Sequence, residues 1–255
     1  MNDENLEEIL QFSRPFGNKL VELIKIECGA TILDIGMGNG TATFFPAVKK
    51  VSDHGWVIGI DISEEMVRET YSRIQEYRVQ NATVIRSDAQ SLIFKDSTFD
   101  YVLSGFSYVY TTMEEVFRVL KKGGRFGLTT WKTLEDMEWM AEFLKRYIPV
   151  DIRDVCHHDS AEEVKDRLEK AGFKNIRVFT EKVEFVYRNE EQWWEEMLDS
   201  GWRSHVEKIE NMGPGHLEKF KKEAFEGLQV YKYADGLHFG VCALIVLGTR
   251  KMDSG

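Results

Sequence analysis

Short, mostly apolar runs recur along the first half of the chain, and each is followed by a stretch of mixed polarity. The runs lie at 32–35, 57–60, 82–86, 99–103 and 125–131. Between them, apolar positions repeat at helical intervals, and a predicted helix over 64–77 places Met66, Thr70 and Ile74 on one face. Strands that alternate with helices in this way predict an α/β fold with a parallel sheet.

The second half of the chain adds helices and two longer strands. Ser160 and Glu163 have the spacing of a capping box, so a helix is expected to begin there. Thr112 and Glu115 have the same spacing and predict another such helix start. The two late strands are expected at 176–187 and 238–249.

Two further segments are predicted to be helical. The connection at 188–236 is much longer than the roughly 2–5 residues of a hairpin loop, so we expect it to form a helical lid. Pro214, between two glycines, separates two of its helices. Residues 1–28 form an expected N-terminal helical segment, which is interrupted at Pro15.

The segment that joins the first apolar run to the first helix is rich in glycine. Asp34 is followed by glycine at every second position, Gly36, Gly38 and Gly40. A backbone without Cβ atoms can turn sharply and approach a ligand, and the following helix offers free amide groups. Asp61 ends the next strand about 20 residues later, where an acid can accept a hydrogen bond from a ribose hydroxyl. The carboxylate of Asp34 would suit a ligand that carries an ammonium group.

Five segments, in the right order, resemble the motifs of the class I methyltransferases that use S-adenosylmethionine (SAM). They are 34–40, 57–63, 87–89, 99–104 and 120–126, and together they cover roughly residues 30–131. The resemblance implies a three-layer Rossmann-like α/β fold with a seven-stranded, mostly parallel sheet, an antiparallel last strand and a helical lid. It also implies one domain over 1–255.

The same resemblance implies SAM as the cofactor and S-adenosylhomocysteine as its product. Asp61 would then bind the ribose, Ile62 and Met66 would contact the adenine, and Asp88 would accept a hydrogen bond from the adenine amino group. The implied cofactor-binding residues are Asp34, Gly36, Gly38, Gly40, Asp61, Ile62, Met66, Asp88, Ala89 and Ser104. The residues alone leave two alternatives open, a core position for Met66 and a turn cap for Asp88.

Aromatic residues gather in the late part of the chain, where five of the six tryptophans lie at or after position 131. Such residues favour an apolar or planar small-molecule acceptor, although some of them must form core. This region resembles, more weakly, small-molecule methyltransferases near the ubiquinone/menaquinone-biosynthesis and aklanonic-acid types. The candidate acceptor-binding residues are Phe12, Phe106, Tyr108, Trp131, Trp193 and Trp202.

Methyl transfer from SAM depends mainly on alignment of the acceptor with the methyl group, because the thioether leaving group needs no acid. A hydroxyl or an acidic carbon would also need a base, for which His205 and Tyr108 are the candidates. An ordinary half-exposed histidine in the lid is the alternative for His205. Adjacent histidines seldom point at one ion, so residues 157–159 do not predict a metal site, and no metal is expected.

Composition narrows the choice of partners. With 43% apolar residues in 255, the chain can bury one sizeable core, and its formal charge of −10 disfavours a nucleic-acid partner. The three cysteines lack the spacing of a zinc site, and no apolar run approaches the ~20 residues of a transmembrane helix. With an acidic rather than basic N-terminus, these features predict a cytoplasmic monomer or homodimer without a membrane partner.

Three other functions are alternatives to methylation of a small molecule. A nicotinamide-dependent oxidoreductase would show G-x-G-x-x-G, whereas here Gly40 follows Gly38 after one residue and position 41 is threonine. A SAM-binding regulator or scaffold without turnover fits the binding motifs equally well. An RNA or protein methyltransferase is disfavoured by the acidic charge and by the residues at 104–107, which lack an Asn-Pro-Pro-Tyr type motif.

Overall fold

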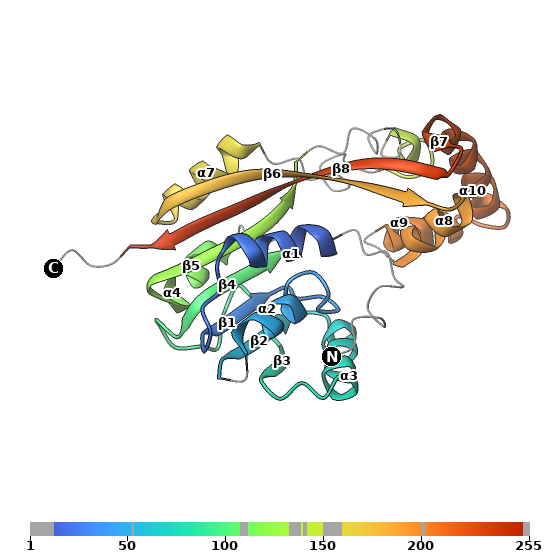
Figure 1. The fold of residues 1–255 in the computed structure, drawn as a ribbon. Coiled ribbons are helices and arrows are strands. Elements are labelled where there is room, and N and C mark those ends of the chain that lie inside the picture. Colours follow the sequence, from blue (N-terminus) through green and yellow to red (C-terminus); the bar gives the residue numbers. More distant parts are fainter. Residues whose placement is uncertain are drawn as a thin grey trace. The chain divides into compact units, whose positions relative to one another are not determined.

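The strands form one sheet in the order β3-β2-β1-β4-β5-β8-β6 (Figure 1). This computed structural model describes residues 13–52, 54–107, 112–132, 139, 142–149, 160–199 and 202–251. The strands are β1 (Thr31–Ile35), β2 (Trp56–Asp61), β3 (Ala82–Arg86), β4 (Phe99–Gly105), β5 (Leu120–Trp131), β6 (Phe173–Tyr187), β7 (Lys232–Tyr233) and β8 (Gly236–Arg250).

The early strands are parallel and the last ones are not. β1 pairs with β2 and β4, β2 with β3, and β4 with β5, all in parallel. β8 lies between β5 and β6 and runs opposite to β6 (Figure 1). The predicted mostly parallel sheet with an antiparallel last strand is confirmed. Among the described residues, the main order of the sheet has the expected seven strands, and the two-residue β7 is added to them by antiparallel pairing with β8.

Two helices of the described residues begin at a serine that caps them. Ser63 caps α3 by accepting a hydrogen bond from the amide of Met66, and Ser160 forms the predicted capping box with Glu163 at the start of α7. The helices are α1 (Arg14–Leu23), α2 (Phe44–Val51), α3 (Glu64–Glu76), α4 (Met113–Val119), α7 (Ala161–Lys170), α8 (Glu190–Asp199), α9 (Arg203–Glu210) and α10 (His216–Gly227), with the short 3₁₀ helix η3 (Leu228–Tyr231).

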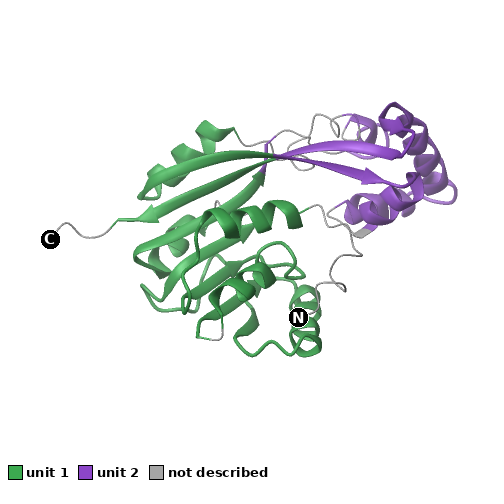
Figure 2. Ribbon diagram, in the orientation of Figure 1, with its two compact units in different colours: residues 1–130, 159–181, 243–255 green, residues 131–158, 182–242 purple. Residues whose placement is uncertain are grey.

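The chain divides into two compact units (Figure 2). Unit 1 comprises Met1–Thr130, Asp159–Glu181 and Ala243–Gly255, and unit 2 comprises Trp131–His158 and Lys182–Cys242. Unit 2 therefore includes the predicted lid and also the residues that follow β5. The interpretation of 1–255 as one domain stays a prediction.

Unit 1 contains two apolar cores, one on each face of its part of the sheet. On one face, Val116 of α4 and Leu168 of α7 belong to the same core as Leu33 of β1. On the other face, Leu20 of α1 and Phe44 of α2 belong to the core that includes Ile32 of β1. Alternate residues of β1 thus point to opposite helical layers, and the three-layer arrangement is confirmed.

Unit 2 is built around an aromatic core. Its helices α8, α9 and α10 confirm the helical nature of the connection at 188–236, and residues 211–215 separate α9 from α10. The rings of Phe143 and Phe220 stack with centroids 4.8 Å apart, and those of Tyr231 and Phe239 lie 4.7 Å apart. Stacked and edge-on rings of this kind bury a large apolar area in a small unit.

The helix start predicted at Thr112 is confirmed, because Thr112 is the N-cap residue of α4, but the expected capping box is not formed. Thr112 makes no side-chain capping bond, because Glu115 instead accepts hydrogen bonds from Arg118 over 2.6 Å and from the amide of Leu92 over 2.7 Å. The first crossover helix, α2, begins at Phe44. This start places Pro46 in the first turn, where proline is tolerated.

Candidate active site

The glycine turn leaves the carboxyl end of β1 and is held by the neighbouring strand. The amides of Gly36 and Met37 donate to the carbonyl oxygen of Ile60, over 2.9 and 3.1 Å. Gly36, Gly38 and Gly40 have φ angles of 64°, 55° and 82°. These left-handed conformations favour glycine, so the sequence pattern follows directly from the turn that the backbone makes.

The three glycines differ in what surrounds them. A Cβ atom on Gly36 would lie 2.3 Å from the Cβ of Ser107, and one on Gly40 would lie 2.8 Å from the ring of Phe45. A Cβ atom on Gly38 would meet nothing within 4 Å. Gly36 and Gly40 are therefore required by packing within the protein, whereas Gly38 borders open space that a ligand can approach.

Asp34, which precedes the turn, is completely buried. Its two carboxylate oxygens lie 2.9 and 2.8 Å from the hydroxyl of Thr43, which donates to them. Burial raises the pKa of Asp34 to about 7; the hydrogen bond from Thr43 opposes this shift, and the negative charge of Asp61 adds to it. The carboxyl group is thus poised between its neutral and ionised forms near neutral pH.

Asp61, at the end of β2, connects the turn to the next helix. Its Oδ2 accepts a hydrogen bond from the amide of Gly38, and its Oδ1 accepts one from the amide of Ser63, each over 2.9 Å. The hydroxyl of Thr70 on α3 donates to the carbonyl of Gly38 over 2.8 Å. A carboxylate has about four lone-pair sites, so Asp61 retains acceptor capacity for a ligand hydroxyl.

The side chains predicted to contact an adenine lie beside Asp61 in unit 1. Ile62 is 67% exposed, which is unusual for an isoleucine and leaves an apolar surface available, and Met66 on α3 is half-buried. Asp88 follows β3 and is exposed; its Oδ1 accepts a hydrogen bond from the amide of Gln90 over 2.9 Å. Asp88 therefore caps its own turn, and Ala89 beside it is half-buried.

Ser104 and the residues after it close the end of β4. The hydroxyl of Ser104 is buried and lies 2.7 Å from that of Ser107, which donates to the carbonyl of Ile35 over 3.0 Å. Phe106 has a φ angle of 56°, and its ring meets the buried ring of Phe16 edge-on at 5.8 Å. The hydroxyl of Ser104 therefore has a partner within the protein, and its role toward a cofactor stays a prediction.

The remaining predicted residues are spread over unit 2 or lie outside the described residues. His205 and Trp202 are half-buried neighbours at the start of α9, with ring centroids 6.0 Å apart. Trp193 is only 1% exposed and stacks on Phe239, and Trp131 at the end of β5 is half-buried. Their roles toward an acceptor stay predictions. Phe12, Tyr108 and the histidines at 157–158 lie outside the described residues.

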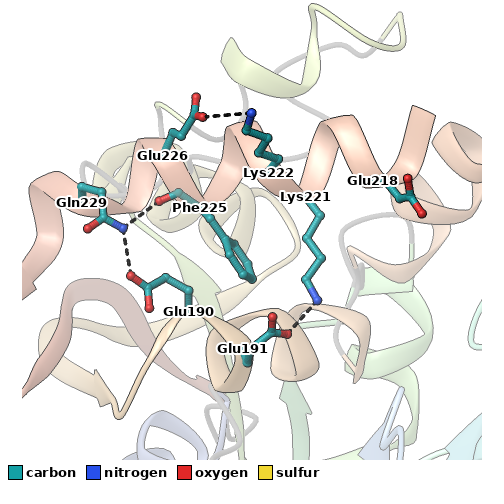
Figure 3. Close-up of a pocket in the computed structure, with 8 residues that line it drawn as sticks. All are labelled: Glu190, Glu191, Glu218, Lys221, Lys222, Phe225, Glu226 and Gln229. Carbon is teal, nitrogen blue, oxygen red and sulfur yellow. Dashed lines mark hydrogen bonds and ion pairs between the residues drawn. The ribbon is translucent and has the colours of Figure 1, made fainter. Parts of the chain in front are cut away.

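A surface hollow of about 590 Å³ lies between α8 and α10 in unit 2 (Figure 3). Lys221 pairs with Glu191 over 2.6 Å there, and Gln229 donates to Glu190 over 2.8 Å. Two of its carboxylates are thus bound by neighbouring side chains, and none of the predicted site residues lines this hollow. We assign no ligand to it.

Sequence reasoning missed two side chains that hold the site together. Thr43 is the hydrogen-bond partner of Asp34, and Ser107 occupies the space beside Gly36. For Thr43 a signal was present, because Pro46 fits the first turn of a helix that begins at residue 44 and so makes residue 43 its N-cap. For Ser107 the chain gives no such signal, since the contact joins residues far apart in sequence.

The described residues show neither a metal centre nor a membrane span. No group of three or more histidine, cysteine, aspartate or glutamate side chains there is arranged to hold a metal ion. Among the same residues, no helix is both long and apolar enough to cross a membrane.

The strand order, the glycine turn after β1 and the acid at the end of β2 define a Rossmann-like domain for a nucleotide-type cofactor. A family described as "Methyltransferase domain" matches residues 26–185. The chain therefore belongs to this family of SAM-dependent methyltransferases.

Proteins similar to this chain are also named methyltransferases. Aklanonic acid methyltransferase DauC of Streptomyces sp. (strain C5) is 32% identical over 48% of this chain, and the match spans only 57% of that relative. Demethylmenaquinone methyltransferase of Anoxybacillus flavithermus is 24% identical over 69% of this chain and 84% of that relative. The crystal structure of a SAM-dependent methyltransferase from Aquifex aeolicus, 26% identical, has a TM-score of 0.53 over 70% of this chain and 92% of its own.

Proposed function

We propose that this protein transfers a methyl group from SAM to an oxygen, carbon or nitrogen atom of a small organic molecule. The observation that carries the proposal is the open approach to Gly38, between the buried acid Asp34 and the ribose-type acid Asp61. The family and the names of the relatives support it, because both relatives described above are named for small-molecule acceptors.

We assign the cofactor-binding roles within unit 1. Asp61 binds the ribose and also holds the glycine turn. Asp34 faces the ammonium group, and Ile62 and Met66 provide an apolar surface for the adenine. Asp88 has a second carboxylate oxygen for the adenine amino group. When bound, SAM supplies an activated methyl group, and the protein contributes mainly by fixing its orientation.

The acceptor is proposed to be apolar or planar. The support is the aromatic content of unit 2 and of the segment after β4, where Phe106, Trp131 and Trp202 are half-buried rather than fully packed. His205 and Tyr108 are the proposed bases for an acceptor that must lose a proton. A cytoplasmic location and a monomeric or homodimeric state stay predictions.

Two measurements test the proposal. Calorimetric titration of the full chain with S-adenosylhomocysteine, with NAD as a parallel control, should give micromolar binding of the former alone. Incubation with methyl-labelled SAM and a panel of quinones, polyketide acids and amines should then give a labelled small product. Binding of NAD alone would point to hydride transfer. Binding of S-adenosylhomocysteine without turnover of any acceptor would favour a regulator or scaffold, and labelled RNA or protein would favour a macromolecular substrate.

A further inference from the structure

Asp34 has no contact with solvent and only one hydrogen-bond donor among the described residues. The hydroxyl of Thr43 lies between its two carboxylate oxygens, at 2.9 and 2.8 Å. A single neutral hydroxyl compensates little of the cost of burying a charge. The group must therefore either keep a proton or take a cationic partner.

The surroundings of Asp34 supply no such partner. In the sheet it lies beside Gly59 of β2 and Leu103 of β4, both uncharged, and Thr43 at the start of α2 is neutral. The charged group that acts on it is Asp61, which has the same sign and raises its pKa together with burial. Within the described part of the chain, no lysine or arginine pairs with Asp34.

Thr43 occupies a position that normally serves its own helix. It is the N-cap residue of α2, where a threonine hydroxyl usually accepts a hydrogen bond from an amide of the first turn. No such bond is formed here, and the hydroxyl donates to Asp34 instead. Thr43 is 1% exposed, so its hydroxyl is shielded from bulk solvent.

We propose that Thr43 is a positioning residue for Asp34, and that cofactor binding exchanges a proton on Asp34 for the ammonium group of the cofactor. The exchange breaks the carboxyl O–H bond and releases the proton to the buffer; no electrons are transferred. The ammonium group then pairs with the carboxylate that Thr43 holds in place. The inference rests on the proposed function, and it requires cofactor affinity to fall as the pH decreases through neutrality.

The experiment is calorimetric titration of the full chain with S-adenosylhomocysteine at pH 6 and pH 8, each in two buffers of different ionisation enthalpy. For a carboxyl group that titrates near neutrality, binding should release about 0.9 proton at pH 6 and about 0.1 at pH 8. The dissociation constant should be about tenfold larger at pH 6. Asp34→Asn should lose both the pH-dependent proton release and the pH dependence of whatever affinity it retains.

Substitution of Thr43 separates positioning from a structural role. Thr43→Val removes the hydroxyl at constant shape, so the pH at which affinity falls should move upward and the dissociation constant at pH 7 should rise about tenfold. Thr43→Ser should restore the wild-type profile, and Thr83→Val on β3 should leave it unchanged. A purely structural role would lower the unfolding temperature of Thr43→Val but leave its pH profile and proton release as in wild type, which would overturn the assignment.

The outcomes also distinguish this inference from the proposed function. If wild type fails to bind S-adenosylhomocysteine at pH 8, both are overturned. If wild type binds it with the same affinity at pH 6 and pH 8, or if Asp34→Asn releases as many protons as wild type, only the proton exchange is overturned.

Discussion

The carboxylate of Asp61 accepts a hydrogen bond from the amide of Gly38 over 2.9 Å, so the end of β2 holds the middle of the glycine turn. Gly38 is also the glycine beside which a Cβ atom would meet nothing within 4 Å. The side chain of Asp61 thus holds the turn at Gly38, the position that a ligand can approach. A loss of Asp61 should therefore affect the ligand in two ways, through its own contact and through the turn.

We predict that Asp61→Ala weakens binding of S-adenosylhomocysteine by about 100-fold. The change removes a charged acceptor from two backbone amides and from the proposed ribose contact, and a hydrogen bond to a charged group contributes about 1.5–3 kcal/mol. Calorimetric titration measures the effect. Asp166→Asn, at an exposed position of α7 that pairs with Lys170, is the matched control and should bind as wild type does. Unchanged affinity in Asp61→Ala would show that the site is assigned wrongly.

Alanine substitutions of Gly36 and Gly38 should have opposite effects on fold stability and on cofactor binding. Gly36→Ala places a methyl group 2.3 Å from Ser107, so it should destabilise the fold by about 3 kcal/mol. Gly38→Ala meets no protein atom and should lose only about 1 kcal/mol to its left-handed backbone, yet it should weaken S-adenosylhomocysteine binding at least tenfold. Thermal unfolding and titration of both variants separate the effects. Wild-type affinity in Gly38→Ala would contradict a cofactor at this turn.

The part of the fold that follows from local pattern was predictable from the sequence. Alternating apolar runs and helical stretches predicted the strands of unit 1, and Thr112 and Ser160 marked the starts of their helices correctly. The glycine spacing predicted the turn, because its left-handed backbone requires residues without Cβ atoms. Each of these signals lies within a few residues of the structure that it specifies.

The capping box at Thr112 failed because other residues bind its glutamate. Glu115 has capping-box spacing from Thr112, but Arg118 and the amide of Leu92 bind its carboxylate instead. The hydroxyl of Ser104 lies beside that of Ser107, a contact that the sequence does not predict, and its role toward the cofactor stays a prediction. Such contacts depend on tertiary packing, and sequence spacing cannot decide which partner is preferred.

Substitutions of Trp193 and Trp202 should distinguish a residue of the core from a residue that contacts the acceptor. Trp193 is 1% exposed and its ring stacks on Trp139 and Phe239, so Trp193→Ala should destabilise the protein by about 3–5 kcal/mol. Trp202 is half-buried, and Trp202→Ala should instead raise KM for the acceptor about tenfold with little change in unfolding temperature. Calorimetric melting and steady-state kinetics measure the two. A stable Trp193→Ala variant with an impaired acceptor KM would move that residue from the core to the binding surface.

His205→Gln should lower kcat by about 100-fold or more while leaving S-adenosylhomocysteine affinity unchanged, because the loss of a general base affects turnover alone. Single-turnover kinetics with saturating SAM, together with calorimetric titration, separate chemistry from binding. His216→Gln, at the start of α10, is the matched control, since its ring hydrogen-bonds the carbonyl of Gly213 and no site role is predicted for it. If kcat is retained in His205→Gln, the residue is an ordinary histidine of unit 2.

Asp34→Asn should stabilise the ligand-free protein in a pH-dependent way while it weakens cofactor binding. The folded-state pKa of Asp34, about 7, lies above its ordinary value of 3.8, so the folded state keeps a proton that the unfolded state releases over this range. Stability of the wild type therefore falls as pH rises from about 4 to about 7 and is level above that. Asn carries no charge and does not titrate. The pH-dependent gain in the free energy of unfolding of Asp34→Asn over wild type should therefore be absent at pH 4 and reach at most about 4 kcal/mol at pH 8.

Chemical unfolding of wild type and Asp34→Asn at both pH values measures this difference, with Asp166→Asn as the control for an exposed carboxylate. An equal difference at pH 4 and pH 8 would mean that Asp34 is ionised in the folded state throughout. A stabilised Asp34→Asn variant that no longer binds S-adenosylhomocysteine would show that a buried acid is retained here at a cost to stability, because the cofactor requires it.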